Sequence, residues 1–237
     1  MLYLIGLGLN ERGISKEGLL ALKKCSKVYL ENYTIDFPYD TNELHLDKEI
    51  TPLGRSEVES NKLIKEAKSK KIALLVYGCP LFATTHMTLV KDAEKAGVRV
   101  EVIYAASIFD GIAETGLQLY KFGKITSMPA WTKNYHPESF IDIIKENQSI
   151  KAHSLILLDI GMSFKKAIEQ LEIASKNKEI LLDKIIVCSN IGNERSKIRY
   201  DTIEELKKQR FELPICFIIP EELHFLEKEV LEGVGED

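Results

Sequence analysis

Apolar positions in the first half of the chain alternate between short continuous runs and longer amphipathic stretches. A continuous apolar run predicts a strand that is buried on both faces. A stretch with a period of three to four residues predicts a helix that covers a sheet. The predicted strands are residues 2–5, 28–30, 72–77 and 98–102. Because single helices separate these strands, we expect a parallel sheet with right-handed crossovers.

Capping residues mark the predicted helices of this half. Ser15 can cap the first helix, and Ser56 with Glu59 has the spacing of a capping box ahead of the second. A third helix begins at about Thr84 and ends at Gly97, a residue type that often follows a helix. The apolar faces expected for the first two helices are Leu19, Leu22 and Cys25, and then Leu63, Ile64 and Ala67.

The second half has a different spacing of predicted strands and helices. Buried-type strands are expected at residues 153–160, 184–188 and 214–219. One helix begins near Asp201, whose carboxylate suits a helix N-terminus, and residues 221–231 form a closing helix or an extended tail. Another helix follows the first of these strands, and its predicted apolar face is Phe164, Ala167, Ile168, Leu171 and Ile173. The change of rhythm near residues 107–115 predicts two domains, residues 1–110 and 111–237.

Composition and charge exclude several classes of protein. The chain has 237 residues, 45% of them hydrophobic, which is enough apolar material for a sizeable core. Its net charge of −4 disfavours generic binding to nucleic acid phosphates. No apolar run approaches the roughly 18–20 residues that span a membrane, and the first residues lack the pattern of a signal peptide.

The four cysteines predict a reducing compartment. They are too far apart for a C-x-x-C pair, so we expect no disulfide framework and no metal site. Cys25, Cys188 and Cys216 lie in apolar surroundings and are expected to be buried free thiols of a cytoplasmic protein.

The glycines after the first predicted strand allow two interpretations. Gly6-Leu7-Gly8 has the start of a dinucleotide-binding fingerprint, but Glu11 stands where the third glycine would be. The glycines therefore either form a tight turn alone or let the backbone approach some ligand closely.

Residues 78–86 are the stretch richest in candidate chemistry, because ligands of open α/β sheets gather where a buried strand meets the following helix. A purely structural interpretation is also open here. In it, Thr84 or Thr85 caps the following helix, and His86 packs in the core or caps the same helix. Cys79 could act as a nucleophile only with a base nearby. The sequence contains no phosphate-binding loop, zinc-protease helix or hydrolase nucleophile elbow.

Taken together, these pieces resemble the diphthine synthase family, part of the tetrapyrrole methylase-like class of S-adenosylmethionine-dependent methyltransferases. The resemblance covers almost the entire chain, and its strength lies in the order and spacing of the fragments. They are residues 1–9, Ala83 to His86, Ser107-Ile108, Gly116-Leu117, Tyr120 to Gly123, Leu157 to Ile160, Ile219-Pro220 and Leu223-His224.

The resemblance implies two α/β domains of the tetrapyrrole methylase type. The N-terminal domain would have a parallel sheet and the C-terminal domain a mixed one, with S-adenosyl-L-methionine in the cleft between them. No catalytic base and no metal ligand is implied. The implied cofactor contacts are Leu9, Cys79, Phe82, Ser107, Ile108, Leu158, Ile191 and His224.

Two positions depart from the family pattern. The family has Gly-Asp-Pro where this chain has Gly78-Cys79-Pro80, and Ser189 to Gly192 replaces its usual Ala-Arg-Ala-Gly. A carboxylate suits the positive charges of S-adenosylmethionine, whereas a thiol is a weak hydrogen-bonding group. Either the cofactor binds more weakly here, or another group compensates.

The resemblance also implies the acceptor. It is the amino group of a 3-amino-3-carboxypropyl arm on a histidine of translation elongation factor 2, which three methyl transfers convert to diphthine. The family forms homodimers, so we expect a homodimer that binds neither nucleic acid directly nor membranes.

Two alternatives remain open at this point. Relatives of the same fold methylate corrin precursors, although those enzymes have a third glycine where Asn10 stands here. The chain could also be a catalytically weak relative that only binds the elongation factor, since Cys79 and Ser189-Asn190 alter the expected cofactor loops.

Overall fold

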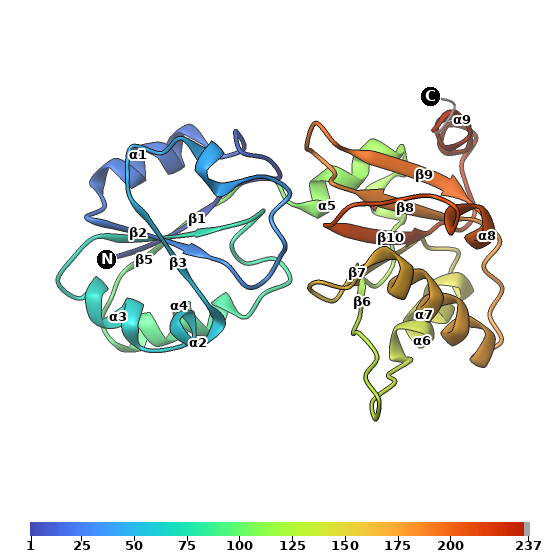
Figure 1. Cartoon of the computed structure of the whole chain (residues 1–237), viewed down its shortest axis with the longest axis horizontal. Coiled ribbons are helices and arrows are strands. Elements are labelled where there is room, and N and C mark those ends of the chain that lie inside the picture. The colour runs from blue at the N-terminus through green and yellow to red at the C-terminus, as the bar shows by residue number, and fades with distance from the viewer. Residues whose placement is uncertain (235–237) are drawn as a thin grey trace. The chain divides into compact units, whose positions relative to one another are not determined.

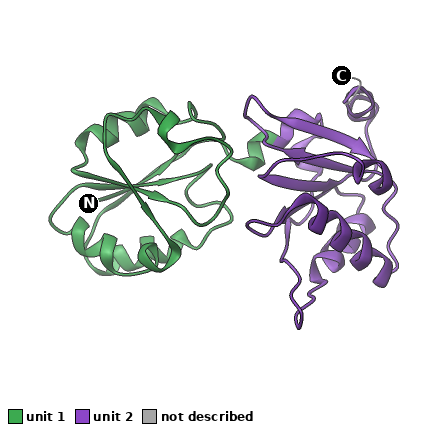
Figure 2. Ribbon diagram, viewed as in Figure 1, with its two compact units in different colours: residues 1–111 green, residues 112–237 purple. Residues whose placement is uncertain are grey.

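The computed structural model describes residues 1–234 and divides into two compact units. Unit 1 comprises residues 1–111 and unit 2 comprises residues 112–237 (Figure 2). This division falls one residue from the boundary expected from the sequence. Each unit is built on a five-stranded sheet of its own, so the chain has two α/β domains.

The sheet of unit 1 is parallel throughout, as predicted. Its strands are β1 (Leu2–Gly6), β2 (Lys27–Glu31), β3 (Ile50–Leu53), β4 (Ile72–Val76) and β5 (Val100–Ile103), in the order β3-β2-β4-β1-β5. β3 was not predicted from the sequence. It lies at the sheet edge and contains Pro52, and such a short, half-exposed strand carries no continuous apolar run.

Strand order reverses between β1 and β4. From β1 the chain crosses to β2 on one side, and from β4 it crosses to β5 on the other. Figure 1 shows the consequence: α1 (Lys16–Lys24) covers one face, and α2 (Arg55–Val58), α3 (Lys62–Ala67) and α4 (His86–Lys95) cover the other. The connections that follow β1 and β4 therefore lead to opposite faces of the sheet, and open α/β sheets bind ligands at the carboxyl edge between two such connections.

The predicted helices of unit 1 exist, but two details of the prediction are wrong. The Ser15 side chain caps α1 as expected, whereas Leu19 is 40% exposed and Ala21 takes its place on the buried face. No Ser56–Glu59 capping box forms: α2 begins after Gly54, and the Glu57 side chain accepts from Gly54 N at 3.3 Å. In both cases the observed residues lie two positions from the expected ones, because the position of a helix on the sheet determines its first residue and its buried face, and local spacing does not.

Unit 2 contains the predicted mixed sheet. Its strands are β6 (Thr126–Met128), β7 (Ser154–Leu158), β8 (Ile185–Ser189), β9 (Lys197–Asp201) and β10 (Ile215–Ile219), in the order β6-β7-β10-β8-β9. β6 and β7 are parallel, and β10 runs antiparallel to both of its neighbours. The helices are α6 (Ser139–Ser149), α7 (Phe164–Asn177), α8 (Ile203–Leu206) and α9 (Phe225–Gly233), and the short α5 (Ile108–Gly111) ends unit 1.

The second half also differs from prediction in places. Asp201 ends β9, and the side chain of Thr202 caps α8. Ile173 is 47% exposed, and Ala174 lies on the buried face of α7 instead. β9 is half-exposed along its whole length, so its sequence shows no clear alternation.

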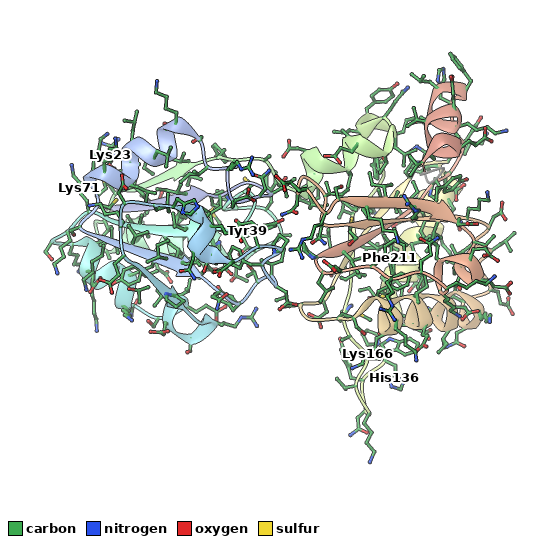
Figure 3. All side chains as sticks on the ribbon, turned by 45° about the horizontal axis from the view of Figure 1, so that its top comes forward. Lys23, Tyr39, Lys71, His136, Lys166 and Phe211 are labelled. Carbon is green, nitrogen blue, oxygen red and sulfur yellow. The ribbon has the colours of Figure 1, made fainter. Side chains whose placement is uncertain are left out.

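Separate hydrophobic cores stabilise the two units. In unit 1, Tyr39 packs with Phe37 and Tyr77 on the α1 side of the sheet (Figure 3). In unit 2, α6 and α7 pack on the sheet, and Phe211 contacts Phe164 with ring centroids 4.5 Å apart (Figures 1 and 3). All four cysteines are free and buried, as predicted for three of them. Among the described residues no helix is both long and apolar enough to cross a membrane.

Candidate functional site

Three loops of unit 1 converge at the carboxyl edge of its sheet. They follow β1, β4 and β5, and the first two are joined by backbone hydrogen bonds. Gly78 N donates to Gly8 O at 2.9 Å, and Gly8 N donates to Gly78 O at 3.4 Å. A Cβ at Gly6 would lie 2.6 Å from Gly78 O and 2.8 Å from the Cβ of Ala105. This close approach requires glycine at position 6.

Leu9 is held in the first of these loops. Gly8 has a φ of +74°, which favours glycine, and this turn directs the chain back along the edge. The Tyr77 hydroxyl then donates to the Leu9 carbonyl at 3.0 Å. Burial raises the pKa of Tyr77 well above its usual value, so the phenol remains a neutral donor. Leu9 is 8% exposed, and the Gly6-Leu7-Gly8 turn thus places a fixed backbone at the edge.

Cys79 and Phe82 occupy the second loop and point to different environments. Cys79 is buried, whereas Phe82 is 49% exposed. The Phe82 ring meets Phe109 of α5 edge to face, with centroids 5.2 Å apart and an interplanar angle of 81°. Ala83, next in the chain, has a φ of +52°, an uncommon conformation for a residue with a side chain. The loop therefore presents a half-exposed aromatic ring beside a buried thiol.

Ser107 and Ile108 follow β5 and complete this edge of unit 1. The Ser107 backbone N–H and hydroxyl both donate to Asp110 Oδ2, at 2.7 and 3.0 Å, and its hydroxyl accepts from Phe109 N. The hydroxyl is thus occupied in forming the turn into α5. A Cβ at Gly78 would lie 3.8 Å from the Ser107 Cα, so this turn borders the second loop. The five candidate residues of unit 1 lie on these three loops.

In unit 2, Leu158 and Ile191 lie at one edge of the sheet. Leu158 ends β7, and Ile191 follows β8 by two residues. Both strand ends lie opposite the start of β10, because Leu157 pairs with Cys216 and Ser189 pairs with Ile215. Ile191 is 4% exposed, and only part of its side chain could contact a ligand.

His224 lies at the other edge of the same sheet. β10 ends at Ile219, which pairs with Ser154 at the start of β7. The His224 ring accepts a hydrogen bond from Leu226 N, and the backbone N–H of His224 donates to Glu227 Oε2 at 2.7 Å. The structure therefore separates His224 from Leu158 and Ile191 within unit 2, and gives it the role of capping α9.

Ile215 lies at the same edge as Leu158 and Ile191 and is not among the candidates from the sequence. It is the first residue of β10 and lies between the ends of β7 and β8. The only sequence signal that could have revealed it is the strand order, because an antiparallel β10 must begin where β7 and β8 end. Residue spacing alone contains no such information.

Comparison with known proteins agrees with this fold. The family model of the tetrapyrrole (corrin/porphyrin) methylases matches residues 1–207. Diphthine synthase of Methanococcus vannielii is 40% identical over 254 aligned positions, which cover all of both chains. Diphthine synthase of Methanocaldococcus jannaschii is 40% identical over 256 positions, with the same full coverage.

A solved structure extends the agreement to three dimensions. A crystal structure of diphthine synthase matches 98% of this chain and 95% of its own, with a TM-score of 0.88 and 33% identity. The sequence match spans both units, and the structural match spans both sheets. The chain therefore belongs to the tetrapyrrole methylase family and, within it, to the diphthine synthases, the methyltransferases of diphthamide biosynthesis.

Proposed function

We propose that this chain transfers three methyl groups from S-adenosyl-L-methionine to one amino group on translation elongation factor 2. That group belongs to the 3-amino-3-carboxypropyl arm of a modified histidine, and the product is diphthine. The observation that carries the proposal is the convergence of three loops at the strand-order reversal of unit 1, in a chain similar to diphthine synthases over its full length.

The loops of unit 1 have the character that the cofactor requires. Leu9 and Ile108 supply apolar side chains, and Phe82 offers a half-exposed ring for the adenosyl group. Since Asp110 occupies the Ser107 hydroxyl, Ser107 would contact the cofactor through its backbone. In unit 2 we propose Leu158 and Ile191, joined by Ile215, whereas the capping role of His224 argues against its inclusion.

Asp110 is the candidate substitute for the carboxylate that the family has at the position of Cys79. The turn of Ser107 to Asp110 borders the loop that carries Cys79, and the Asp110 carboxylate lies at its exposed end. We propose that this carboxylate supplies part of the negative charge that attracts the cofactor. The charge compensation would be partial, because two donors of Ser107 already share one of its oxygens.

The proposed contact residues bind and orient the cofactor, and none of their side chains is a strong acid or base. When bound, S-adenosylmethionine supplies a methyl group that its sulfonium already activates. The work left to the protein is to hold the amine about 3 Å from that carbon and to exclude water, a proximity effect. The rigid glycine contacts at Gly6 and Gly78 suit such a task, because they fix the loops before the ligand arrives.

Partner and compartment follow from the same proposal. The substrate is a protein of translation, so we propose a cytoplasmic enzyme, and we propose a homodimer as its form in solution. Exposed apolar side chains on α9 and before β6, among them Phe225, Val230 and Tyr120, offer candidate surface for either partner.

The first experiment is a calorimetric titration of the purified protein with S-adenosylmethionine and with S-adenosylhomocysteine. We expect micromolar binding at one site per chain, followed by transfer of labelled methyl groups to elongation factor 2 that carries the 3-amino-3-carboxypropyl group. Unmodified elongation factor is the matched control and should remain unlabelled. A folded protein without detectable cofactor binding would contradict the proposal and favour a relative that only binds the factor.

A further inference from the structure

A buried carboxylate and a buried imidazole face each other in unit 1 and have no part in the proposed cofactor contacts. Glu31 ends β2, and His86 begins α4. Their side chains are each 1% exposed, and His86 Nε2 lies 3.6 Å from Glu31 Oε2. Charged residue types are rarely buried to this extent without a purpose.

The hydrogen bonds of His86 determine where its protons lie. Its Nδ1 is 2.8 Å from the carbonyl oxygen of Pro80, and a carbonyl can only accept, so Nδ1 carries a proton. The other ring nitrogen, Nε2, therefore faces Glu31 and holds a second proton only when the ring is charged. Burial raises the pKa of Glu31, although Thr34, His86 and the more distant cation Arg55 oppose this shift. The most favourable state of the pair therefore has one proton between Nε2 and Oε2.

Several polar atoms around this pair lack partners. Neither oxygen of Glu31 nor Nε2 of His86 has a hydrogen bond of normal geometry among residues 1–234. The same holds for the hydroxyls of Tyr33 and Thr84 within these residues. Each unsatisfied buried group costs roughly 1–3 kcal/mol, so a cluster of them calls for an explanation.

A pocket of about 280 Å³ adjoins the pair, and His86 and Tyr33 form part of its wall. It contains two carboxylates, Glu59 and Asp92, and its described lining includes no lysine or arginine. The other lining residues are Val58, Ser60, Asn61, Ile64, Thr85, Thr88 and Leu89. Two cations outside the lining pair with these carboxylates: Arg55, which lies over the Tyr33 ring, pairs with Glu59, and Lys95 pairs with Asp92 at 3.1 Å. A small cavity with acidic and hydroxyl groups suits an ammonium or amine, which donates hydrogen bonds to all of them.

The pocket lies close to the proposed cofactor loop. β4 carries that loop at its end, and β2, which ends in Glu31, is the neighbour of β4 on the side away from β1. Adjacent strands are roughly 4.8 Å apart, so the pair is about one strand from the loop. The bond from His86 to Pro80, the residue after Cys79, joins the pair to the loop directly.

We propose that this pocket receives the amino end of the acceptor arm, and that the Glu31–His86 pair takes the proton which the amine must lose before each methyl transfer. This inference rests on the proposed function and assigns its acceptor subsite. When an ammonium enters the pocket, the proton of the pair passes to solvent, and the ammonium takes its place as the counter-charge of the Glu31 carboxylate. One N–H bond of the ammonium then breaks, and its proton returns to the pair, which restores the favoured one-proton state.

The amine freed in this way has its lone pair available. A new N–C bond forms to the methyl carbon while the C–S bond breaks, and the electron pair of that bond remains on sulfur. The released S-adenosylhomocysteine is neutral at sulfur, and the amine nitrogen becomes positive. The methylated nitrogen is now an ammonium itself, and the proton on the pair passes to solvent when this nitrogen enters the pocket again. Two further rounds give the trimethylated product.

The Glu31→Gln variant separates this role from a structural one. Glutamine keeps the shape of the side chain but removes the charge and the site for a proton. We expect affinity for S-adenosylmethionine within twofold of wild type, a thermal midpoint equal or higher, and kcat/KM for the modified elongation factor at least 100-fold lower. A purely structural residue would lower the midpoint when replaced. The matched control is Glu94→Gln on the exposed face of α4, which should change none of the three.

Each result decides the question. Retention of wild-type kcat/KM by Glu31→Gln overturns the inference and leaves the proposed function intact. A wild-type protein that binds the cofactor but does not label the elongation factor overturns both. If Glu31→Gln loses cofactor affinity, Tyr33→Phe provides the test, since it removes one unpartnered hydroxyl from the pocket wall. We expect it to raise the KM for the acceptor severalfold at unchanged cofactor affinity, and an unchanged KM overturns the inference.

Discussion

Replacing Glu227 by glutamine tests how a buried carboxylate holds α9 in unit 2. Its side chain is fully buried and accepts hydrogen bonds from Gln118 N at 2.9 Å, His224 N at 2.7 Å and Lys121 Nζ at 2.5 Å. Burial opposes ionisation, but the bonds from Lys121 and from the two backbone N–H groups outweigh it and lower the pKa of Glu227 to about 2.

The lowered pKa gives the magnitude of the effect. Between the ordinary value of 4.5 and a value of about 2, ionisation of this carboxylate adds roughly 3 kcal/mol to the stability of the fold. Because the folded state holds the proton less tightly than the unfolded state, this contribution is complete above pH 4.5 and is lost as the pH falls toward 2. Glu227→Gln should therefore lose about 3 kcal/mol near neutral pH and show a weaker dependence on acid.

Trp131 makes the measurement specific to unit 2. It is the single tryptophan of the chain, and its indole N–H donates to Pro137 O at 3.0 Å next to the unit 2 core. Urea unfolding followed by tryptophan fluorescence, near pH 7 and near pH 3, thus reports the unit that contains Glu227. Burial also lowers the pKa of His153, and the Glu227 carboxylate opposes this shift, so the two proteins also differ in the acid-dependent contribution of His153.

The exposed Glu229 of the same helix provides the control, since Glu229→Gln should unfold like wild type at both pH values. Two results would refute the reasoning. One is a Glu227→Gln protein that unfolds at the wild-type urea concentration near pH 7. The other is an equally steep loss of stability toward acid in the two proteins.

Three further substitutions test the edge of unit 1. Cys79→Asp should increase the affinity for S-adenosylmethionine about 10- to 150-fold in calorimetry, the equivalent of one hydrogen bond to a charged group. Cys79→Ser should change the affinity little, and equal effects of the two variants would exclude a role for charge. Gly6→Ala should destabilise the fold by roughly 1–3 kcal/mol in denaturant titration, because its Cβ would lie 2.6 Å from Gly78 O; wild-type stability would mean that the loops are not held together. Phe82→Ala should weaken cofactor binding with a stability within about 0.5 kcal/mol of wild type, since the ring is 49% exposed; unaltered binding would remove Phe82 from the site.

The sequence by itself determined the elements with strong local signals. Residues 72–77 could be recognised as a buried strand because their continuous apolar run places apolar side chains on both faces of a strand. The structure has β4 there, and all of its residues are buried. Ser15 could be recognised as a cap because its side chain bonds to a backbone N–H three residues away. The order of the family fragments likewise identified the diphthine synthases before any geometry was known.

Tertiary structure decided the features that depend on pairing between distant segments. β3 and β9 are half-exposed edge strands, so a neighbour in the sheet defines them more than their own pattern does. The antiparallel direction of β10 placed Ile215 beside Leu158, and it placed His224 at the opposite edge.

The meeting of Glu31 with His86 was also invisible in the sequence. The two residues are on different elements, and only the adjacency of β2 and β4 brings them within 3.6 Å. Local sequence fixes which backbone conformations a segment favours, but the free energy of a buried charged pair depends on everything that surrounds it. For this reason the sequence could supply the proposed cofactor loops, whereas the proposed acceptor pocket emerged only from the fold.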